Sequence, residues 1–137
     1  MAMKDINFGS GVKLAGFKSF AAADGTTAFT GPAVDTLGFN AVLLTVSATY
    51  SATDAAKYTL TVQESDDNST YTDAPAGVLI GPAGQLSGSD TVQKIGYVGE
   101  RRYVKLVVTP SAAASSTNTI TVVAHAVLQS PYVAPVA

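Results

Sequence analysis

Alternation of apolar and polar residues with a period of two is the feature that most constrains the fold of this chain. In Tyr58–Ser65, large or apolar residues alternate with small polar ones, and the run ends in an acidic turn at residues 66–69. A second alternating run, Tyr103–Thr109, follows a turn marked by Gly99. Successive side chains of a β-strand point to opposite faces, so each run can bury one face and leave the other in water. The pattern predicts antiparallel strands of a β-sandwich.

Two further segments, 40–50 and 118–128, alternate in the same way and are rich in β-branched residues, which suit the pleated surface of a sheet. Their expected apolar rows are Val42, Leu44, Val46 and Ala48 in the first segment and Ile120, Val122, Ala124, Ala126 and Leu128 in the second. Segment 91–98 is a shorter strand candidate, and segment 12–20 is a weaker one. The sequence therefore predicts about five or six strands.

The segments between these strands carry turn-forming residues. Residues 21–32, 80–90 and 110–117 are rich in Gly, Pro, Ser and Ala, which predicts surface loops. Residues 52–57 could form a single helical turn, too short to be stable alone. With 137 residues, the chain fits one domain over residues 1–137. We expect an all-β fold, an antiparallel β-sandwich or a jelly-roll-like pair of sheets.

The two ends of the chain differ in composition from its middle. Residues 1–32 scatter aromatic side chains among glycines, which predicts an extended N-terminal arm or peripheral segment. Residues 129–137 contain prolines, which cannot donate to a strand ladder, and this predicts a C-terminal tail. The ends either fold back over the sheets or reach onto neighbouring subunits.

The charge content argues against several classes of partner. Charged residues make up 13% of the chain, against about 25% in ordinary domains, and the net charge is −2. A chain without a basic cluster does not suit nucleic acid, and no apolar run reaches the length of about 18 residues that a membrane span needs. Weak self-repulsion favours assembly into a larger particle. The N-terminus lacks the pattern of a secretory signal, so we expect synthesis in a cytoplasm.

Residues suited to catalysis or metal binding are few. Cysteine is absent, and His125, the only histidine, lies inside a predicted strand, where a packed or edge-facing side chain is the simpler interpretation. No motif exposes a serine nucleophile. The oxygens of Asp66, Asp67 and Asn68 could contact Ca²⁺, but a hairpin turn with Asn68 in a left-handed conformation explains them better. We therefore expect no enzyme activity, no cofactor and no metal, and leave open whether Asp66 and Asp67 hold an ion.

Two phrases of the sequence carry a resemblance. VQESDDNSTYTDAP at Val62–Pro75 and YVGERRYVKLVVT at Tyr97–Thr109, followed by a β-rich close and the Pro-containing C-terminus at Ser130 and Pro131, resemble small virion structural proteins of tailed bacteriophages. The similarity covers about the last eighty residues. Phrases of this kind also occur in carbohydrate-binding sandwiches.

The resemblance implies a non-enzymatic subunit of a phage particle. Within that class, a capsid decoration or cement protein fits best: a small homo-oligomer, often a trimer, that is made in the bacterial cytoplasm and binds the major capsid protein on the capsid surface. The expected interface residues are Lys4, Phe8, Phe17, Arg101, Arg102 and Tyr132. One arginine of the Arg101–Arg102 pair is expected to pair with Glu100 or Asp90. The alternatives are a neck or tail subunit and a carbohydrate-binding sandwich.

Overall fold

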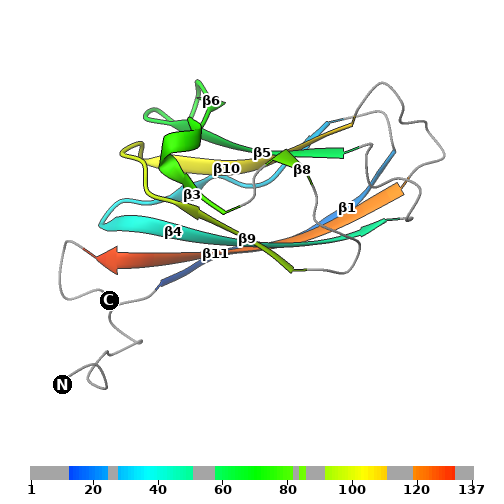
Figure 1. The fold of residues 1–137 in the computed structure, drawn as a ribbon, viewed down its shortest axis with the longest axis horizontal. Coiled ribbons are helices and arrows are strands. Elements are labelled where there is room, and N and C mark those ends of the chain that lie inside the picture. The colour runs from blue at the N-terminus through cyan, green and yellow to red at the C-terminus, as the bar shows by residue number, and fades with distance from the viewer. Residues whose placement is uncertain are drawn as a thin grey trace, which may run out of the picture.

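The computed structural model describes residues 13–24, 28–50, 58–81, 84–85, 92–110 and 119–131. These residues form two antiparallel β-sheets packed face to face, the two layers seen in Figure 1. The helical content of the described residues is one short 3₁₀ turn at Ala76–Val78. Among them, no helix has the length and hydrophobicity that crossing a membrane requires. The predicted all-β sandwich is confirmed.

The first sheet contains five strands in the order β1–β11–β4–β9–β7. They are β1 (Lys13–Asp24), β11 (Thr119–Pro131), β4 (Phe39–Tyr50), β9 (Val92–Tyr97) and β7 (Leu79–Ile80). The long pairing of β11 with β4 runs from Ile120 opposite Tyr50 to Pro131 opposite Phe39. The segments predicted at 40–50, 91–98 and 118–128 therefore share one sheet.

The second sheet contains six strands, with β10 and β5 at its centre. Its strands are β2 (Phe29–Thr30), β3 (Val34–Asp35), β5 (Tyr58–Ser65), β6 (Thr72–Asp73), β8 (Gly84–Gln85) and β10 (Tyr103–Pro110). Strands β5 and β10 pair along their full length, from Tyr58 opposite Pro110 to Ser65 opposite Tyr103. The two clearest alternating runs of the sequence thus lie side by side.

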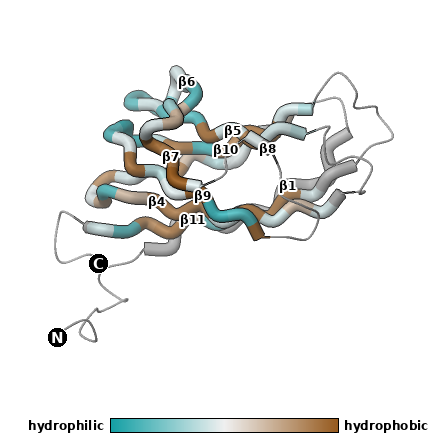
Figure 2. The backbone as a smooth tube through the Cα atoms, in the orientation of Figure 1, coloured by the Kyte–Doolittle hydropathy of each residue, from teal (hydrophilic) through white to brown (hydrophobic). Residues whose placement is uncertain are grey.

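The hydrophobic core lies between the two sheets and contains the described residues of the predicted apolar rows, together with Ile95 and Tyr97 of β9, for which no row was predicted. The first sheet contributes buried residues Val42, Leu44, Val46, Ala48, Ile95, Tyr97, Val122, Ala124, Ala126 and Leu128; the second contributes Tyr58, Leu60, Val62, Val104, Leu106 and Val108. Figure 2 shows hydrophobic positions recurring along the strands of both layers. Burying one large apolar side chain contributes about 1.5–3 kcal/mol, so these rows hold the sheets together.

The structure corrects the predicted limits of both chain ends. Lys13–Asp24 forms β1, the edge strand of the first sheet, paired with β11, so the weaker strand candidate at 12–20 is confirmed and the expected N-terminal arm or peripheral segment contains a sheet strand. The predicted loop at 21–32 contains the end of β1 and strand β2. The predicted tail at 129–137 begins later, because β11 continues to Pro131 opposite Phe39 on the long partner strand β4. The helical turn expected at 52–57 lies outside the described residues.

Candidate functional site

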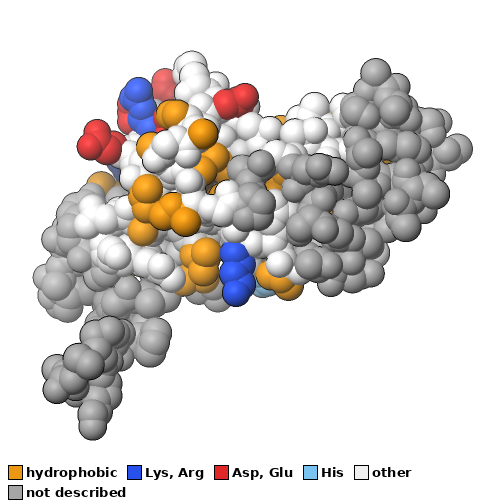
Figure 3. All heavy atoms as spheres, viewed as in Figure 1, with side chains coloured by type: hydrophobic (Ala, Val, Ile, Leu, Met, Phe, Trp, Pro, Cys, Tyr) orange, Lys and Arg blue, Asp and Glu red, His pale blue; other side chains and the backbone are white. Residues whose placement is uncertain are grey.

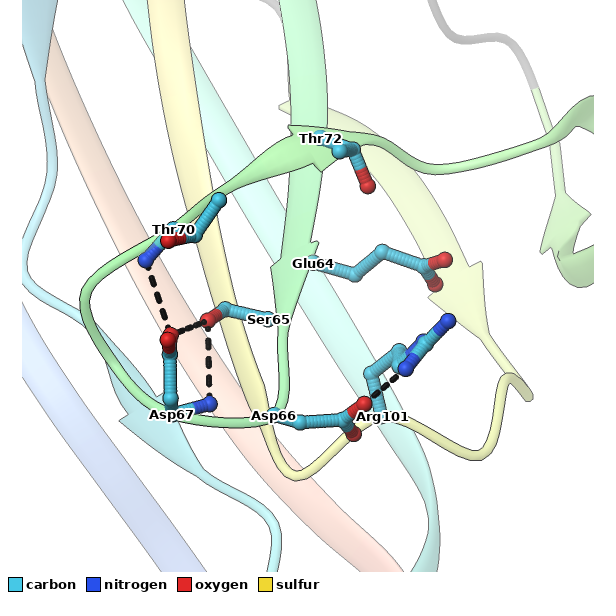
Figure 4. A pocket seen from close by; sticks show the side chains of 7 residues that line it. All are labelled: Glu64, Ser65, Asp66, Asp67, Thr70, Thr72 and Arg101. Atoms are coloured by element: carbon cyan, nitrogen blue, oxygen red, sulfur yellow. Dashed lines mark hydrogen bonds and ion pairs between the residues drawn. The ribbon is translucent and has the colours of Figure 1, made fainter.

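The acidic turn after β5 is held by its own side chains. The Asp67 carboxylate accepts hydrogen bonds from the backbone N–H groups of Ser69 and Thr70, each at 2.8 Å, and from the Ser65 hydroxyl at 2.9 Å. Figure 4 shows the Asp67 carboxylate turned toward Ser65 and Thr70. Asn68 has a φ of 57°, the left-handed conformation expected of it. The predicted structural turn is confirmed.

The turn also fixes the charge of Asp67. Hydrogen bonds from the backbone of Thr70 and Ser69, and then from the Ser65 hydroxyl, lower the pKa of Asp67 to about 2. Its neighbour Asp66 forms an ion pair with Arg101 instead. The two carboxylates thus have different partners. Among the described residues, no group of three His, Cys, Asp or Glu side chains is placed so that it could hold a metal ion.

A polar hollow of about 250 Å³ opens beside this turn. It is lined by Glu64, Ser65, Asp66, Asp67, Thr70, Thr72 and Arg101 (Figure 4). Its ionic groups are engaged with neighbours: Asp66 with Arg101, Asp67 with the turn, and Glu64 with Tyr97. The hollow offers hydroxyl and charged groups to a small polar ligand.

Tyr97 connects the two sheets beneath this hollow. Its side chain is 1% exposed, and its hydroxyl donates to Glu64 Oε2 on β5 at 2.8 Å while accepting the Arg101 N–H at 3.2 Å. Burial, and then the hydrogen bond to Glu64, raise the pKa of Tyr97 above its ordinary value. The phenol stays protonated at neutral pH and acts as a structural donor. A Cβ at Gly99 would overlap this phenol, so the turn needs glycine there.

The two adjacent arginines link the acidic turn after β5 and the short strand β3 to the start of β10. Arg101 forms an ion pair with Asp66. Arg102 donates two hydrogen bonds to the Asp35 carboxylate, from Nε to Oδ1 at 2.9 Å and from Nη2 to Oδ2 at 2.8 Å. The Arg102 guanidinium also lies 5.0 Å from the centre of the Tyr103 ring. The sequence suggested Glu100 or Asp90 as a partner and missed both of these pairs, because Asp35 and Asp66 are distant in sequence.

The remaining predicted interface residues are not brought together by the described part of the structure. Lys4, Phe8 and Tyr132 lie outside the described residues. Phe17 belongs to β1, where it pairs with His125 of β11. His125 is half-buried on the outer side of the first sheet, in agreement with a packed strand residue. The interface role of these residues stays a prediction.

The outer side of the first sheet is a broad surface with almost no charge, which we call the neutral face. Its described side chains are Ala41, Leu43, Thr45, Ser47, Thr49, Ile80, Val92, Lys94, Gly96, Val98, Thr121, Val123, His125, Val127 and Gln129. Lys94 is the one lysine, arginine or carboxylate among them. Ile80 is 62% exposed and Val98 46% exposed, although both are large and apolar.

One row of backbone register crosses all five strands of the first sheet. Leu14 pairs with Val127, Val127 with Leu43, Leu43 with Gly96, and Gly96 with Ile80. Leu43, Gly96 and Ile80, together with Lys94 and Gln129, line a shallow, largely apolar hollow of about 300 Å³. In Figure 3, charged side chains gather at the end that carries β6, whereas the lower layer shows hydrophobic side chains on both sides of a basic one.

Sequence reasoning missed this surface, although a signal for it was present. In segments 40–50 and 118–128, the rows opposite the core contain Leu43, Val123 and Val127 where a solvated strand would carry charges.

Comparisons with known proteins add no site: no protein-family model matches the chain, and a search of curated proteins finds no match. The neutral face and the polar hollow are therefore the two candidate sites.

Proposed function

We propose that this chain is a non-enzymatic structural subunit of a tailed-phage particle, a decoration (cement) protein on the outside of the capsid. The observation that carries the proposal is the neutral face, a wide surface whose described side chains include a single formal charge, at Lys94. A surface of this kind suits binding to a partner through many modest contacts spread over a large area. Together with the phage-like phrases of the sequence, it supports a building block that is made in the bacterial cytoplasm and assembles on the particle.

Cementing a shell requires many modest contacts rather than one reactive group. Each Å² of apolar surface removed from water contributes about 25 cal/mol before the cost of ordering. A homo-oligomeric subunit that bridges several copies of the major capsid protein multiplies such contacts through avidity. The charged groups of Arg101, Arg102 and Asp67 form contacts within the chain itself. These contacts hold its own structure in place, which suits a structural role.

Co-sedimentation with empty shells tests this function. The shells are assembled from the major capsid protein encoded nearest to this chain, and we expect the full chain to sediment with them and to raise their melting temperature. Failure of the full chain to co-sediment would contradict the decoration role. Co-sedimentation with isolated tails instead of shells would support the neck or tail alternative.

A truncation tests whether the N-terminal end bridges capsid subunits. Because β1 begins at Lys13, only residues 1–12 can be removed without deleting part of a sheet strand. We expect this truncation to weaken shell binding by about tenfold or more while the melting temperature of the sandwich stays unchanged. A variant with residues 1–12 replaced by a Gly/Ser segment of equal length controls for chain length. Unchanged binding by both variants would contradict the bridging arm.

The polar hollow favours one alternative, a carbohydrate-binding sandwich. Thr70, Thr72 and Arg101 offer hydroxyl and guanidinium groups to a sugar. The nearby Tyr71 ring is a poorer stacking platform, because the Lys105 ammonium already lies 3.6 Å from its centre. A glycan array with wild type and Arg101→Ala separates the two functions. Specific binding that Arg101→Ala removes would favour the sugar-binding alternative.

A further inference from the structure

We propose that the outer row of β9 is a docking strip for an extended protein segment that carries an apolar side chain two positions from a carboxylate. The strip, which we call the β9 strip, consists of Val92, Lys94, Gly96 and Val98, with Ile80 of β7 beside Gly96. The inference deepens the proposed function and rests on it for the source of the segment, which is the major capsid protein. Exposed apolar side chains, the hollow at Gly96 and the charge of Lys94 carry it.

The large apolar side chains that the described residues expose are concentrated on the β9 strip. Val92 is 58% exposed, Ile80 62% and Val98 46%. Leu37, in the turn before β4, is the one other described residue of this kind. Side chains on one face of a strand repeat about every 6.8 Å, so the row from Val92 to Val98 is about 20 Å long. This long, narrow shape suits an extended chain better than a compact small molecule.

The hollow at Gly96 provides a place for one apolar side chain of that segment. Its volume is about 300 Å³, and its lining includes the hydrocarbon side chains of Leu43, Ile80 and Val98. The hollow is shallow, so it covers an entering side chain only in part. A second contact beside it must therefore add affinity and specificity.

Lys94 supplies that second contact, because it also lines the hollow and is exposed. Arg101 and Arg102 each form an ion pair within the chain, and Lys105 lies against the Tyr71 ring. Among the lysine and arginine side chains that the structure describes, Lys94 is the one to which it gives no such contact. The group that complements a free ammonium on a partner is a carboxylate.

The spacing on β9 sets the spacing on the partner. Lys94 and Gly96 are two positions apart on the same face of one strand. An extended segment that lies along β9 has the same repeat, so it meets the two positions with side chains that are also two positions apart. The expected pattern is therefore an apolar residue and an aspartate or glutamate separated by one residue.

Titration of the full chain with a blocked peptide of nine residues tests this recognition. The peptide alternates threonine with valine, glutamate, leucine and valine, one side chain for each position of the row. Nuclear magnetic resonance of the labelled chain is expected to show saturable shifts at the amides of Val92, Lys94, Gly96 and Ile80, with a dissociation constant of about 1 mM or lower. The absence of saturable shifts, or shifts confined to other residues, would overturn the proposal.

A reversal of charge tests the role of Lys94. Lys94→Glu is expected to weaken binding of the peptide about fivefold or more, and to bind instead the peptide in which lysine replaces glutamate. Lys105→Glu makes the same change on the second sheet and is the matched control, expected to bind like wild type within about twofold. Thermal unfolding establishes that both variants are folded. Equal weakening by the two variants would overturn the proposal.

Assembled shells separate this inference from the decoration role. Lys94→Glu is expected to weaken co-sedimentation about fivefold or more, whereas Lys105→Glu leaves it unchanged. Shell binding that Lys94→Glu leaves intact would overturn the docking strip while the decoration role stands. Loss of shell binding by wild type, with peptide binding retained, would contradict the decoration role and support the recognition chemistry. A two-chain mass in light scattering that Lys94→Glu splits would assign the strip to a second copy and overturn the proposal.

Discussion

The two outer faces of this sandwich cover the same core but differ in chemistry. The outer side of the second sheet, which we call the polar face, forms its own side-chain contacts: the Gln63 amide donates to Asp73 at 2.9 Å, and the Lys105 ammonium lies 3.6 Å from the centre of the Tyr71 ring. The neutral face instead presents Leu43, Ile80 and Val127 beside hydroxyl and amide groups. Covering the polar face would desolvate several charged groups, whereas the described side chains of the neutral face include one formal charge, at Lys94. The two faces therefore differ in the number of charged groups that they present to their surroundings.

The largest expected effect separates the neutral face from the core behind it. Leu128 and Val127 are adjacent in β11, but Leu128 is fully buried and Val127 points outward. Leu128→Ala is expected to lower the free energy of unfolding by about 2–5 kcal/mol, because it leaves a cavity. Val127→Ala is expected to lower it by under about 1 kcal/mol. Urea denaturation of dilute protein measures both, and equal losses would mean that the neutral face belongs to the core.

The next effect concerns the link between the two sheets. Tyr97→Phe removes the hydrogen bond to Glu64 and is expected to cost about 1–3 kcal/mol of unfolding free energy. Tyr103→Phe on the polar face is the control, expected within about 0.5 kcal/mol of wild type. Thermal and urea unfolding measure both variants. Equal costs would show that the Tyr97–Glu64 contact contributes nothing specific.

Tyr97 also predicts a loss of stability in alkali. Its pKa is raised in the folded chain, so the folded state holds the phenol proton more tightly than the unfolded state. The resulting stability is fully present below the ordinary tyrosine pKa of 10.0 and is lost as the pH rises above it. The unfolding free energy of wild type should fall above pH 10 more steeply than that of Tyr97→Phe. Parallel pH profiles of the two proteins would contradict this.

A smaller effect is expected at the Arg102–Asp35 pair. Arg102→Ala is expected to cost up to about 1 kcal/mol at low salt, and less at high salt, because the pair is partly exposed and screened by ions. Lys94→Ala, which removes the charge of the neutral face, is expected to leave the unfolding free energy unchanged. Urea denaturation at low and high ionic strength measures both. A cost at Lys94 equal to that at Arg102 would break the contrast between the two faces.

The smallest effect is the acid dependence set by Asp67. The pKa of Asp67 is about 2 in the folded chain against an ordinary 3.8, so the unfolded state binds the proton more tightly. The stability from this carboxylate is present above about pH 4 and is lost as the pH falls toward 2. Asp67→Asn should therefore show a flatter stability profile over that interval, as followed by thermal unfolding. An unchanged slope would mean that the turn does not hold the carboxylate in solution.

Much of the fold could be predicted from the sequence because its signals are local. The alternation in β5 and β10 predicted that each strand buries one face, without knowledge of their partners, and the apolar residues of those faces, Leu60, Val62, Val104 and Leu106, are buried. The turn at Asn68 could also be predicted, because Asp and Asn side chains form hydrogen bonds with backbone groups a few residues away. The strand ends at Asp24 and Pro131 were missed, because their pairing depends on how far β11 and β4 extend together.

The candidate sites lay largely beyond sequence reasoning. Strand pairing within the second sheet brings Asp35 of β3 and Asp66, just after β5, beside the arginines at the start of β10. Packing of the two sheets brings Tyr97 to Glu64. The row from Leu14 through Val127, Leu43 and Gly96 to Ile80 joins five segments in an order that differs from their order in the chain. Strand order and register result from long-range pairing, which the local period of two does not specify.

The sequence by itself determined which residues alternate between core and surface, where the acidic turn reverses the chain, and that charge is scarce. Those properties follow from the geometry of a strand and from turn chemistry, both of which act over a few residues. The tertiary structure alone decided that the scarcity of charge is concentrated on one side of the sandwich. Only the pairing of strands in register places Val127, Leu43, Gly96 and Ile80, which are distant in the sequence, in one row of that face.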